Sequence, residues 1–581
     1  MQTSPTQKSP LAPEVEAELQ MFAQQVAALR SGERDPDDFK RFRLENGVYG
    51  IRDTTDQHMI RVKIRFGALS ADQLDALADI AEQFTPTQHG HITTRQDVQF
   101  HHIALADVPT VLRRLADCGL TTREACGNTV RNVACCPIAG IAPDGPFDVT
   151  PYADAVSSFF LRNPLNQNLP RKFKIAFEGC TTDHAKVAIH DLGIVAQLRD
   201  GRRGFQLYVA GGLGPIPLSA QLLEDFTPEE LLFPSIEAVL RIFDRHGNRK
   251  DRNRARLKFV LKDWGLEKFR ELWLAERKIA LLTRSGRHDW RVPMTEEGPP
   301  PRLDTPAQPA PQTPAYARWR VTNCFAQKQA GYFGVHVRCP LGDLTHGQMR
   351  AVAAVARRFC GGRMRATITQ NLLLRWVRER DLPAVYRELD AHALALHEAD
   401  HVADITRCPG ADTCQLGITH SRGLAAALDD LFQNGLASDP ALQHLSIKIS
   451  GCPNSCGQHH IADLGFYGNA RTLDGHQVAH YRLLLGGGTT LREATFGEAI
   501  MALPAKRVPD AVKKILSHFR DTRQNGETFQ TFTQRLGPEH FKQFLAEFAE
   551  LPRYAERPDL YGDLGLEGEF KVKLGKGECA A

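Results

Sequence analysis

The sequence has no run of eighteen apolar residues, the length that a helix needs to cross a membrane. Residues 1–13 contain prolines and polar side chains and lack the apolar centre of a secretory signal peptide. No Gly-x-Gly-x-x-Gly follows an expected strand, so the fingerprint of flavin- and nicotinamide-binding domains is missing. We therefore expect a cytoplasmic protein that does not insert into a membrane and that has no flavin- or nicotinamide-binding domain of its own.

An excess of charge of one sign is also missing. The chain has 72 Lys and Arg against 68 Asp and Glu, a formal net charge of +4. This balance does not indicate binding to nucleic acid, and we predict no nucleic-acid partner. The basic run over residues 245–256 is expected to be a solvated helix face, or alternatively a docking surface for an acidic partner.

Cysteine is present, but not in the arrangement of a secreted disulfide framework, because the count of 13 is odd and the spacings are irregular. Two short runs rich in turn residues hold four of the cysteines: Cys408-Pro-Gly-Ala-Asp-Thr-Cys414 and Cys452-Pro-Asn-Ser-Cys456. Cys-Pro beside a closely spaced second Cys is typical of iron–sulfur ligands. The alternatives are buried core thiols, which the turn residues disfavour, and a structural zinc site, for which the first spacing is wide.

One pattern occurs twice in the chain. Residues 62–73 align with residues 337–348, since each has an extended segment followed by Gly, by Leu, and then by Ser70 or Thr345 with Gln three positions later. This is a capping box, which starts a helix. Strand-like segments follow in both copies, over residues 91–100 and 366–376.

A second pair of segments also matches. Residues 177–193 align without gaps with residues 449–465, so that Cys180 falls on Cys452 and His184 falls on Cys456. The first copy therefore looks like a cluster site without its full ligand set. Repetition at this length indicates duplicated halves and not a solenoid of short units.

The chain accordingly divides into segments, with a small α/β unit followed by a larger one in each half. We expect an N-terminal extension with one helix near residues 14–29, a Pro-rich linker with eight prolines, and a Gly-rich, charged C-terminal tail with little to anchor it. The boundaries are 1–45 (extension), 46–120 (small unit), 121–290 (large unit), 291–315 (linker), 316–400 (small unit), 401–550 (large unit) and 551–581 (tail).

Four basic side chains of the first half stand where strands and turns would otherwise be apolar: Arg95, Arg131, Lys172 and Lys174. Lys172 and Lys174 alternate with Phe173, which predicts that both lie on one face of a strand. For each residue alone, a surface side chain that extends its charge into solvent is the alternative. Together they predict an anion pocket, because like charges converge only around something negative. Lysines in such a pocket can also deliver protons.

With these motifs, the chain resembles the sirohaem-containing sulfite and nitrite reductases, specifically the haemoprotein of assimilatory sulfite reductase. The resemblance spans roughly residues 45–550 and implies an α+β fold in which two ferredoxin-like half-domains pair and two larger α/β domains surround sirohaem and an iron–sulfur cluster. It rests on the cysteine pairs, the duplication and three segments: Thr94-Arg95-Gln96, Val130-Arg131-Asn132 and Pro170-Arg171-Lys172-Phe173-Lys174.

The resemblance implies a role for each motif residue. A [4Fe–4S] cluster is held by Cys408, Cys414, Cys452 and Cys456, the last of which also ligates the sirohaem iron. The oxyanion is bound by Arg95, Arg131, Lys172 and Lys174. Residues on segments that surround the macrocycle in similar proteins are Arg61, Arg65, Gln96, Gln99, Asn132 and Gln370. Some relatives carry a Tyr–Cys crosslink beside the sirohaem, for which Tyr49 and Cys126 are the candidates here.

The implied activity is the six-electron reduction of sulfite to sulfide in sulfate assimilation, with electrons from ferredoxin or an NADPH-dependent flavoprotein. The first alternative is nitrite reduction to ammonia, which residues 134–140 resemble more closely. Similar nitrite reductases typically carry Asn at the position of Lys174. Since sulfite is mostly a dianion near neutral pH and nitrite is a monoanion, a fourth cation favours sulfite. The alternative of another class is a non-catalytic metal-binding or regulatory protein.

Overall fold

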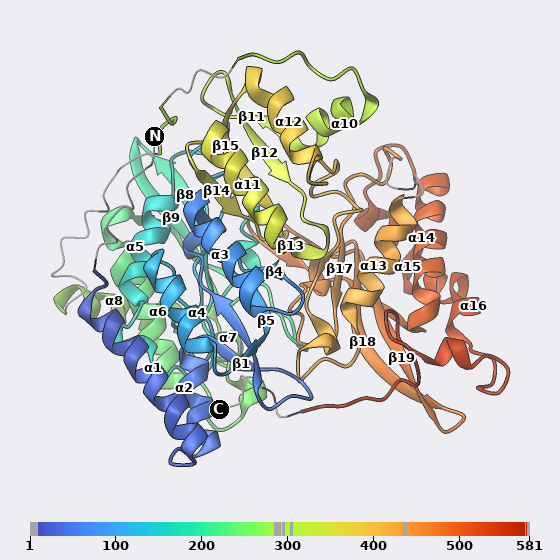
Figure 1. The fold of residues 1–581 in the computed structure, drawn as a ribbon, viewed down its shortest axis with the longest axis horizontal. Helices are drawn as coiled ribbons and strands as arrows, with labels where there is room; N and C mark the ends of the chain where they lie inside the picture. Colours follow the sequence, from blue (N-terminus) through green and yellow to red (C-terminus); the bar gives the residue numbers. More distant parts are fainter. Residues whose placement is uncertain are drawn as a thin grey trace.

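The computed structural model describes residues 10–283, 292, 297–301, 306–433, 436, 439–575 and 577. Within these ranges, the chain builds four five-stranded sheets, two in each half, and helices cover them (Figure 1). No helix of the described chain is long and apolar enough to cross a lipid bilayer.

The two small sheets exchange their edge strands. In sheet order, the first contains β1 (Val48–Gly50), β2 (Gln57–Val62), β5 (Val98–Ala104), β4 (His89–Ile92) and β13 (Asp343–Thr345). The second contains β11 (Cys324–Ala326), β12 (Tyr332–Val337), β15 (Leu372–Arg378), β14 (Arg363–Ala366) and β3 (Ala68–Ser70). Each sheet thus ends on a strand supplied by the other half, paired antiparallel. The predicted pairing of duplicated half-domains is confirmed.

A helix follows each exchanged strand. Both α3 (Ala71–Phe84) and α11 (His346–Phe359) begin with the predicted capping box, at Ser70 and Thr345. The two helices lie side by side (Figure 1) and share one apolar core with both small sheets. The further helices of these units are α4 (Val108–Asp117), α10 (Pro314–Asn323) and α12 (Leu382–Asp390).

The strand-like segments predicted over residues 91–100 and 366–376 do contain strands, but neither segment is continuous. Each segment is two strands joined by a tight turn, in which Gln96 and Gln370 have φ of +60° and +71°. A non-glycine residue with positive φ gives no sequence signal of a turn. The correction places Arg95 in a turn between β4 and β5, and not within a strand.

The two large sheets are mixed, and each begins with three parallel strands. In sheet order they contain β6 (Ala134–Cys135), β7 (Ile175–Glu178), β8 (Leu192–Arg199), β9 (Arg202–Val209) and β10 (Gln221–Pro228), and β16 (Thr406–Arg407), β17 (Ile447–Ser450), β18 (Leu464–Leu473), β19 (His476–Leu485) and β22 (Glu498–Pro504). A separate pair is formed by β20 (Gly488–Thr489) and β21 (Ala494–Thr495). Because the carboxyl ends of parallel strands meet at one edge, the residues that follow them are brought together.

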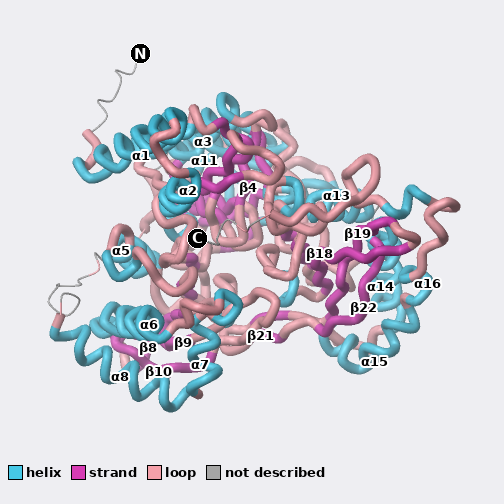
Figure 2. The backbone as a smooth tube through the Cα atoms, turned by 90° about the horizontal axis from the view of Figure 1, so that it is seen from below, coloured by secondary structure: helices cyan, strands magenta, loops and turns pink. Residues whose placement is uncertain are grey.

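Helices pack on the outer side of each large sheet (Figure 2). The first sheet is covered by α5 (Thr150–Phe160), α6 (Leu232–His246), α7 (Leu257–Trp264) and α8 (Leu266–Leu282), and the second by α13 (Ser421–Gln433), α14 (Val508–Thr522), α15 (Phe529–Phe544) and α16 (Ala546–Ala549). Each sheet with its helices encloses a separate apolar core. The carboxyl edges of the parallel strands therefore stay available for a site.

Both chain ends differ from expectation. The N-terminal extension has two helices, α1 (Pro13–Ser31) and α2 (Pro36–Glu45), where one was predicted. The signal for α2 was present, since Asp35 caps the main-chain N–H groups of residues 37 and 38 and a proline follows it.

The linker 291–315 lies partly outside the described residues, but Glu297 bonds Arg365 at 2.8 Å.

The C-terminal tail is anchored, contrary to the prediction. Leu560, Tyr561 and Phe570 are buried, and Asp563 accepts a hydrogen bond from the main chain of His420 at 2.8 Å. These anchors are few and widely spaced in a glycine-rich, charged segment, so composition concealed them. The tail packs on the domain that holds the two cysteine runs.

An ion cluster joins the halves at the exchanged strand β13. Asp343 accepts from His91 Nδ1 at 2.9 Å and from Arg407 Nη2 at 2.6 Å, and it also pairs with Arg422. Burial would raise the pKa of the Asp343 carboxyl, but Arg407 and the bond from His91 lower it well below its usual value. The folded state thus prefers ionised Asp343, which stabilises the fold above the unfolded pKa of about 4 and stops doing so as pH falls further.

We expect Asp343→Asn to destabilise the protein by about 3 kcal/mol at pH 7, because the buried Arg407 loses its partner. The measurement is the midpoint of thermal unfolding from pH 7 down to pH about 2, in which the gap to wild type should stay constant to about pH 4 and narrow below it. Asp225→Asn, which breaks an exposed pair with Arg199, should change the midpoint little. A gap that widens toward acid pH would contradict the assignment.

Candidate active site

The two cysteine runs lie against each other because they follow neighbouring parallel strands. Cys408 follows β16, Cys452 follows β17, and β16 pairs with β17. Glycines permit the close approach, since a Cβ at Gly451 would lie 2.7 Å from the Cα of Gly410. Across the same contact, the N–H of Gly451 donates to Cys408 Sγ at 3.2 Å. The runs, which are separated by 37 residues in the chain, therefore form one cradle.

The four thiols lie close enough for their charges to act on one another, although their exposure differs. Cys408 and Cys452 are buried, whereas Cys414 and Cys456 are exposed. Burial and then the charge of Cys456 raise the pKa of Cys408. Burial contributes most to the raised pKa of Cys452, and the charges of Cys456, Cys408 and Cys414 raise it further. Thiolates crowded in this way need a cationic centre, and four of them are the ligand set of an iron–sulfur cube, so these residues fit the group.

A turn of the first half touches the second cysteine run. Thr94 Oγ1 donates to the carbonyl of Cys456 at 2.9 Å. The next residue, Arg95, is held by His190 Nε2 at 3.0 Å and by the carbonyl of Asn132 at 3.3 Å. Burial, partly opposed by Asp97, lowers the pKa of Arg95 to about 10. The site is thus shared between the duplicated halves.

Lys172 and Lys174 lie in the extended segment that leads into β7, and not within the strand, while Phe173 between them is buried. Burial and the charges of Arg95 and Lys172 lower the pKa of Lys174 well below its usual value, and Cys456 acts in the opposite direction. Lys174 therefore lies within electrostatic reach of Arg95, Lys172 and Cys456.

Arg131 and Asn132 complete this side of the site. The Arg131 guanidinium donates to the carbonyls of Ala125 and Gly127 at 2.9–3.1 Å, and its charge contributes to the lowered pKa of Arg95. Asn132 Nδ2 donates to the carbonyl of Ile64 at 2.6 Å. Its Oδ1 is buried and has no partner within the described part of the chain. A buried acceptor without a donor indicates room for a bound group.

Sequence reasoning missed the groups beneath the pocket. Asp191 accepts from Arg256 Nη2 at 2.9 Å through both oxygens, and from the main-chain N–H of Lys174 at 2.9 Å. Arg256 is 9 % exposed, so the expectation of a solvated face is wrong for this end of the basic run. The signal was in the duplication, because Asp191 falls on Asp463. This buried pair sets the position of the Lys174 backbone.

Three other residues predicted to surround the macrocycle differ in exposure, since Gln99 is buried, Arg61 is half-buried and Arg65 is exposed. With its amide turned toward Arg61, Gln99 accepts from Nη2 at 2.6 Å and from Nε at 2.8 Å. Arg61 Nη1 also donates to the hydroxyl of Tyr49, which shares a small apolar cluster with Cys126. Arg65 is 45 % exposed and pairs with Asp154 at 3.0 Å. Their contacts to a cofactor stay predictions.

Gln96 and Gln370 join the halves, a role that sequence reasoning missed. Gln96 Nε2 donates to the carbonyl of Ala366 at 2.8 Å, and Gln370 Nε2 donates to the carbonyl of Ile92 at 2.7 Å. Their amide oxygens accept from the main-chain N–H groups of residues 135 and 407. The two turns are therefore locked to each other, which fixes Arg95 beside the cysteine run. Cofactor contact by either amide stays a prediction.

Comparison with known families agrees with this geometry. The family model described as the nitrite and sulphite reductase 4Fe–4S domain matches residues 126–279 and 398–551. The model described as the nitrite/sulfite reductase ferredoxin-like half domain matches residues 49–118 and 325–392. The chain belongs to the nitrite and sulfite reductase family. Its cofactors are those of the family, sirohaem and a [4Fe–4S] cluster, and it is an oxidoreductase.

Similar members of the family carry both activities in their names. The chain is 28 % identical to the assimilatory ferredoxin-dependent nitrite reductase of Haloferax mediterranei, over 92 % of this chain and 91 % of that protein. It is 30 % identical to sulfite reductase [ferredoxin] 1 of Mycolicibacterium paratuberculosis, over 86 % of each. The solved NirA protein of Mycobacterium tuberculosis superposes with a TM-score of 0.75 at 26 % identity, covering 92 % of this chain and 98 % of NirA.

Proposed function

We propose that this chain reduces sulfite to sulfide and takes nitrite as a poorer substrate. The observation that carries the proposal is Lys174, a fourth basic residue in a pocket shared with Arg95, Arg131 and Lys172, within reach of Cys456. A sulfite dianion offsets more of this positive charge than a nitrite monoanion does. A non-catalytic role for the cysteines is disfavoured by the family.

The cysteines have separate tasks in this proposal. Cys408, Cys414, Cys452 and Cys456 would hold the cluster, and Cys456 would also serve as a ligand for sirohaem. When bound, sirohaem and the cluster would pass the six electrons of the reaction from the donor protein to the anion. The buried pair Cys408 and Cys452 excludes water from one side, while the exposed Cys414 and Cys456 leave the other side accessible.

The basic residues bind and orient the anion. Two cations about 5 Å apart repel by about 3 kcal/mol at an effective dielectric constant of 20. A dianion bound between Arg95 and Lys174 would offset such repulsion and add charge-assisted hydrogen bonds to the sulfite oxygens. The same groups polarise the S–O bonds, because positive charge is placed where negative charge accumulates as each oxygen departs.

Proton delivery follows from the electrostatics of Lys174. Each of the three oxygens of sulfite leaves as water and requires two protons. Burial and the neighbouring cations lower the pKa of Lys174, so its ammonium group gives up a proton more readily than a free lysine does. The half-buried position of Lys172 and Lys174 allows protons to return from solvent between steps.

We expect Lys174→Asn to lower kcat/KM for sulfite by about 100-fold and for nitrite by about tenfold or less, as for the loss of one preorganised donor. Comparing the two anions in wild type and variant, with reduced methyl viologen as donor, measures both. Lys268→Asn, an exposed change on α8, is the matched control and should alter neither. Equal losses for the two anions, or a wild type that prefers nitrite, would refute the preference for sulfite.

We propose ferredoxin as the electron donor. Both curated relatives described above are named as ferredoxin-dependent, and Cys414 brings the cluster site to the surface. The test compares turnover with reduced ferredoxin and with NADPH plus a flavoprotein reductase. Activity with the second system alone would overturn this proposal.

A further inference from the structure

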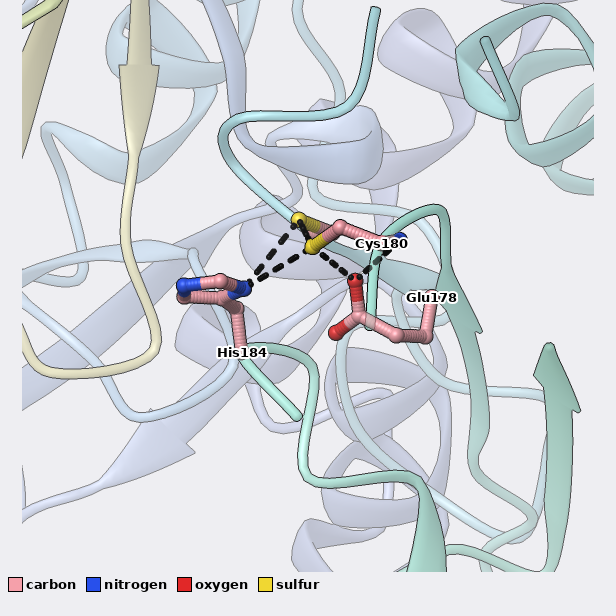
Figure 3. A group of neighbouring side chains, drawn as sticks. Glu178, Cys180 and His184 are labelled. Atoms are coloured by element: carbon pink, nitrogen blue, oxygen red, sulfur yellow. Dashed lines mark hydrogen bonds between the residues drawn. The ribbon is translucent and has the colours of Figure 1, made fainter. Parts of the chain in front are cut away.

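A second group of metal-ligating side chains lies in the first half, apart from the cluster site. It consists of Cys136, Glu178, Cys180 and His184, whose ligand atoms all lie within 4.8 Å of one another. Figure 3 shows Glu178, Cys180 and His184 converging on one point. Cys136, Glu178 and Cys180 are buried, and His184 is partly exposed. Neither the family models nor the proposed reaction assigns a role to this group.

The distances match those around a small tetrahedral ion. Cys136 Sγ lies 3.4 Å from Cys180 Sγ and 3.7 Å from His184 Nδ1. Cys180 Sγ lies 3.1 Å from His184 Nδ1 and 3.0 Å from Glu178 Oε1. With Zn–S of about 2.3 Å and Zn–N or Zn–O of about 2.0 Å, tetrahedral ligand atoms stand about 3.3–3.8 Å apart. Shifts of a few tenths of an ångström therefore complete the site.

We propose that Cys136, Cys180, His184 and Glu178 bind one zinc ion. Two thiolates and an imidazole form a soft donor set, which selects Zn²⁺ over Mg²⁺ or Ca²⁺. Four protein ligands leave no open position, so the ion is structural. Bringing three acidic side chains together in a buried site is costly without a cation, and a divalent ion removes that cost.

The duplication explains how the site arose. The offset that places Cys180 on Cys452 and His184 on Cys456 also places Cys136 on Cys408, and the same offset separates the two stretches that the family model matches, residues 126–279 and 398–551. The counterpart of the fourth cysteine, Cys414, is Ala142. Three converging positions keep soft ligands, but the set no longer suits a four-iron cube. Glu178, whose counterpart is Ser450, supplies a fourth donor for a single ion.

The ligands are held in place before any ion binds. Glu178 Oε1 accepts from the N–H groups of Gly179 at 2.9 Å and Cys180 at 3.2 Å, and its Oε2 accepts from Ala185 at 2.8 Å. Main-chain donors on both oxygens orient the carboxylate, as outer partners do at metal sites. Cys136 follows β6 and the other ligands follow or end β7, so strand pairing fixes the spacing between them.

The ion would also tie down a loop that supports the anion pocket. The chain continues from His184 to His190, which contacts Arg95, and to Asp191, which holds Lys174 and Arg256. Zinc would join this loop to the end of β6. The zinc ion would thus position the loop that supports the anion pocket. This role does not depend on whether sulfite or nitrite is the substrate.

Elemental analysis of the purified holoenzyme tests the proposal. We expect about one zinc per chain in addition to the cofactor iron, and a zinc X-ray absorption spectrum with two sulfur ligands at about 2.3 Å and two nitrogen or oxygen ligands at about 2.0 Å. Protein grown with ample zinc but containing none would overturn the proposal, as would a zinc shell without sulfur. Peptide mapping that finds a Cys136–Cys180 disulfide would overturn it as well.

Variants identify the ligands. Cys180→Ala and His184→Ala should each lose most of the zinc, while Cys135→Ala, a buried thiol one residue from Cys136, should keep it. The visible spectrum of each variant reports sirohaem and cluster separately, so loss of zinc is distinguishable from loss of the redox site. If the first two variants do not fold, the absorption spectrum of wild-type protein decides alone. Full zinc retention in both soluble variants would refute the ligand set.

Discussion

Cys452→Ala is expected to lower the reduction of both anions by about a thousand-fold or more, because the cofactors carry the redox steps. Cys452 is buried at the contact of the two cysteine runs, where the charges of Cys408, Cys414 and Cys456 already act on it. Without this thiolate, the cube loses one of its four ligands. The cradle around Gly410 and Gly451 should then no longer retain the cluster iron. The loss should therefore appear in the cofactor before it appears in the kinetics.

Iron, acid-labile sulfide and the low-temperature magnetic resonance signal of the reduced cluster measure this effect. Cys360→Ala is the matched control, since Cys360 is a fully buried thiol of the second half that follows α11 and lies in the core of the small sheets. It should keep the cluster and the activity. A Cys452→Ala protein with its full complement of iron and sulfide would remove this residue from the ligand set.

Arg95→Leu is expected to lower kcat for sulfite by about 100- to 1,000-fold, the usual cost of removing a preorganised group that stabilises developing negative charge. Unlike the cysteine variant, it should retain both cofactors, because Arg95 is held by His190 and the carbonyl of Asn132 and not by a metal ligand. Its loss should also raise the pKa of Lys174, since the charge of Arg95 helps to lower it. Proton transfer would then shift to higher pH.

The kinetics of Arg95→Leu are to be compared with those of Arg114→Leu, which removes an arginine of the same half-domain that bonds Gln83 at the surface. The pH profile of kcat and the visible spectrum complete the measurement. Wild-type turnover in Arg95→Leu would exclude this residue from catalysis. Loss of sirohaem in proportion to activity would instead assign Arg95 to the cofactor.

The cysteine cradle of the second half and the proposed zinc ligands of the first half show how two duplicated domains keep the same fold but change their ligands. In both halves, short parallel strands end at one edge of the large sheet and bring together the positions that align between the two halves. In the second half, four thiols stand there, and in the first half two thiols, an imidazole and a carboxylate. The fold sets where ligands meet, and side-chain identity sets which metal they suit.

Several features were readable along the chain because their signals are local. The spacing of the cysteines and the prolines beside them is a property of nine or fewer consecutive residues, and so is the capping box at Ser70 and Thr345. The aligned segments around Cys180 and Cys452 predicted duplicated halves, which the pairing of the small sheets confirms. Alternation of Lys172 and Lys174 about Phe173 predicted a shared face, although the strand begins only after them.

Other features arise from contacts between residues far apart in the chain, which no local pattern encodes. Three examples are the exchange of β3 and β13 between the small sheets, the burial of Arg256 against Asp191, and the anchoring of the tail at Phe570. The turn that carries Arg95 depends on a positive φ at Gln96, which its bonds to residues 135 and 366 stabilise. The residue types by themselves indicated the chemistry of this protein, whereas the packing of its two halves determined which of those residues share a site. The reason is that burial and charge act through space and not along the sequence.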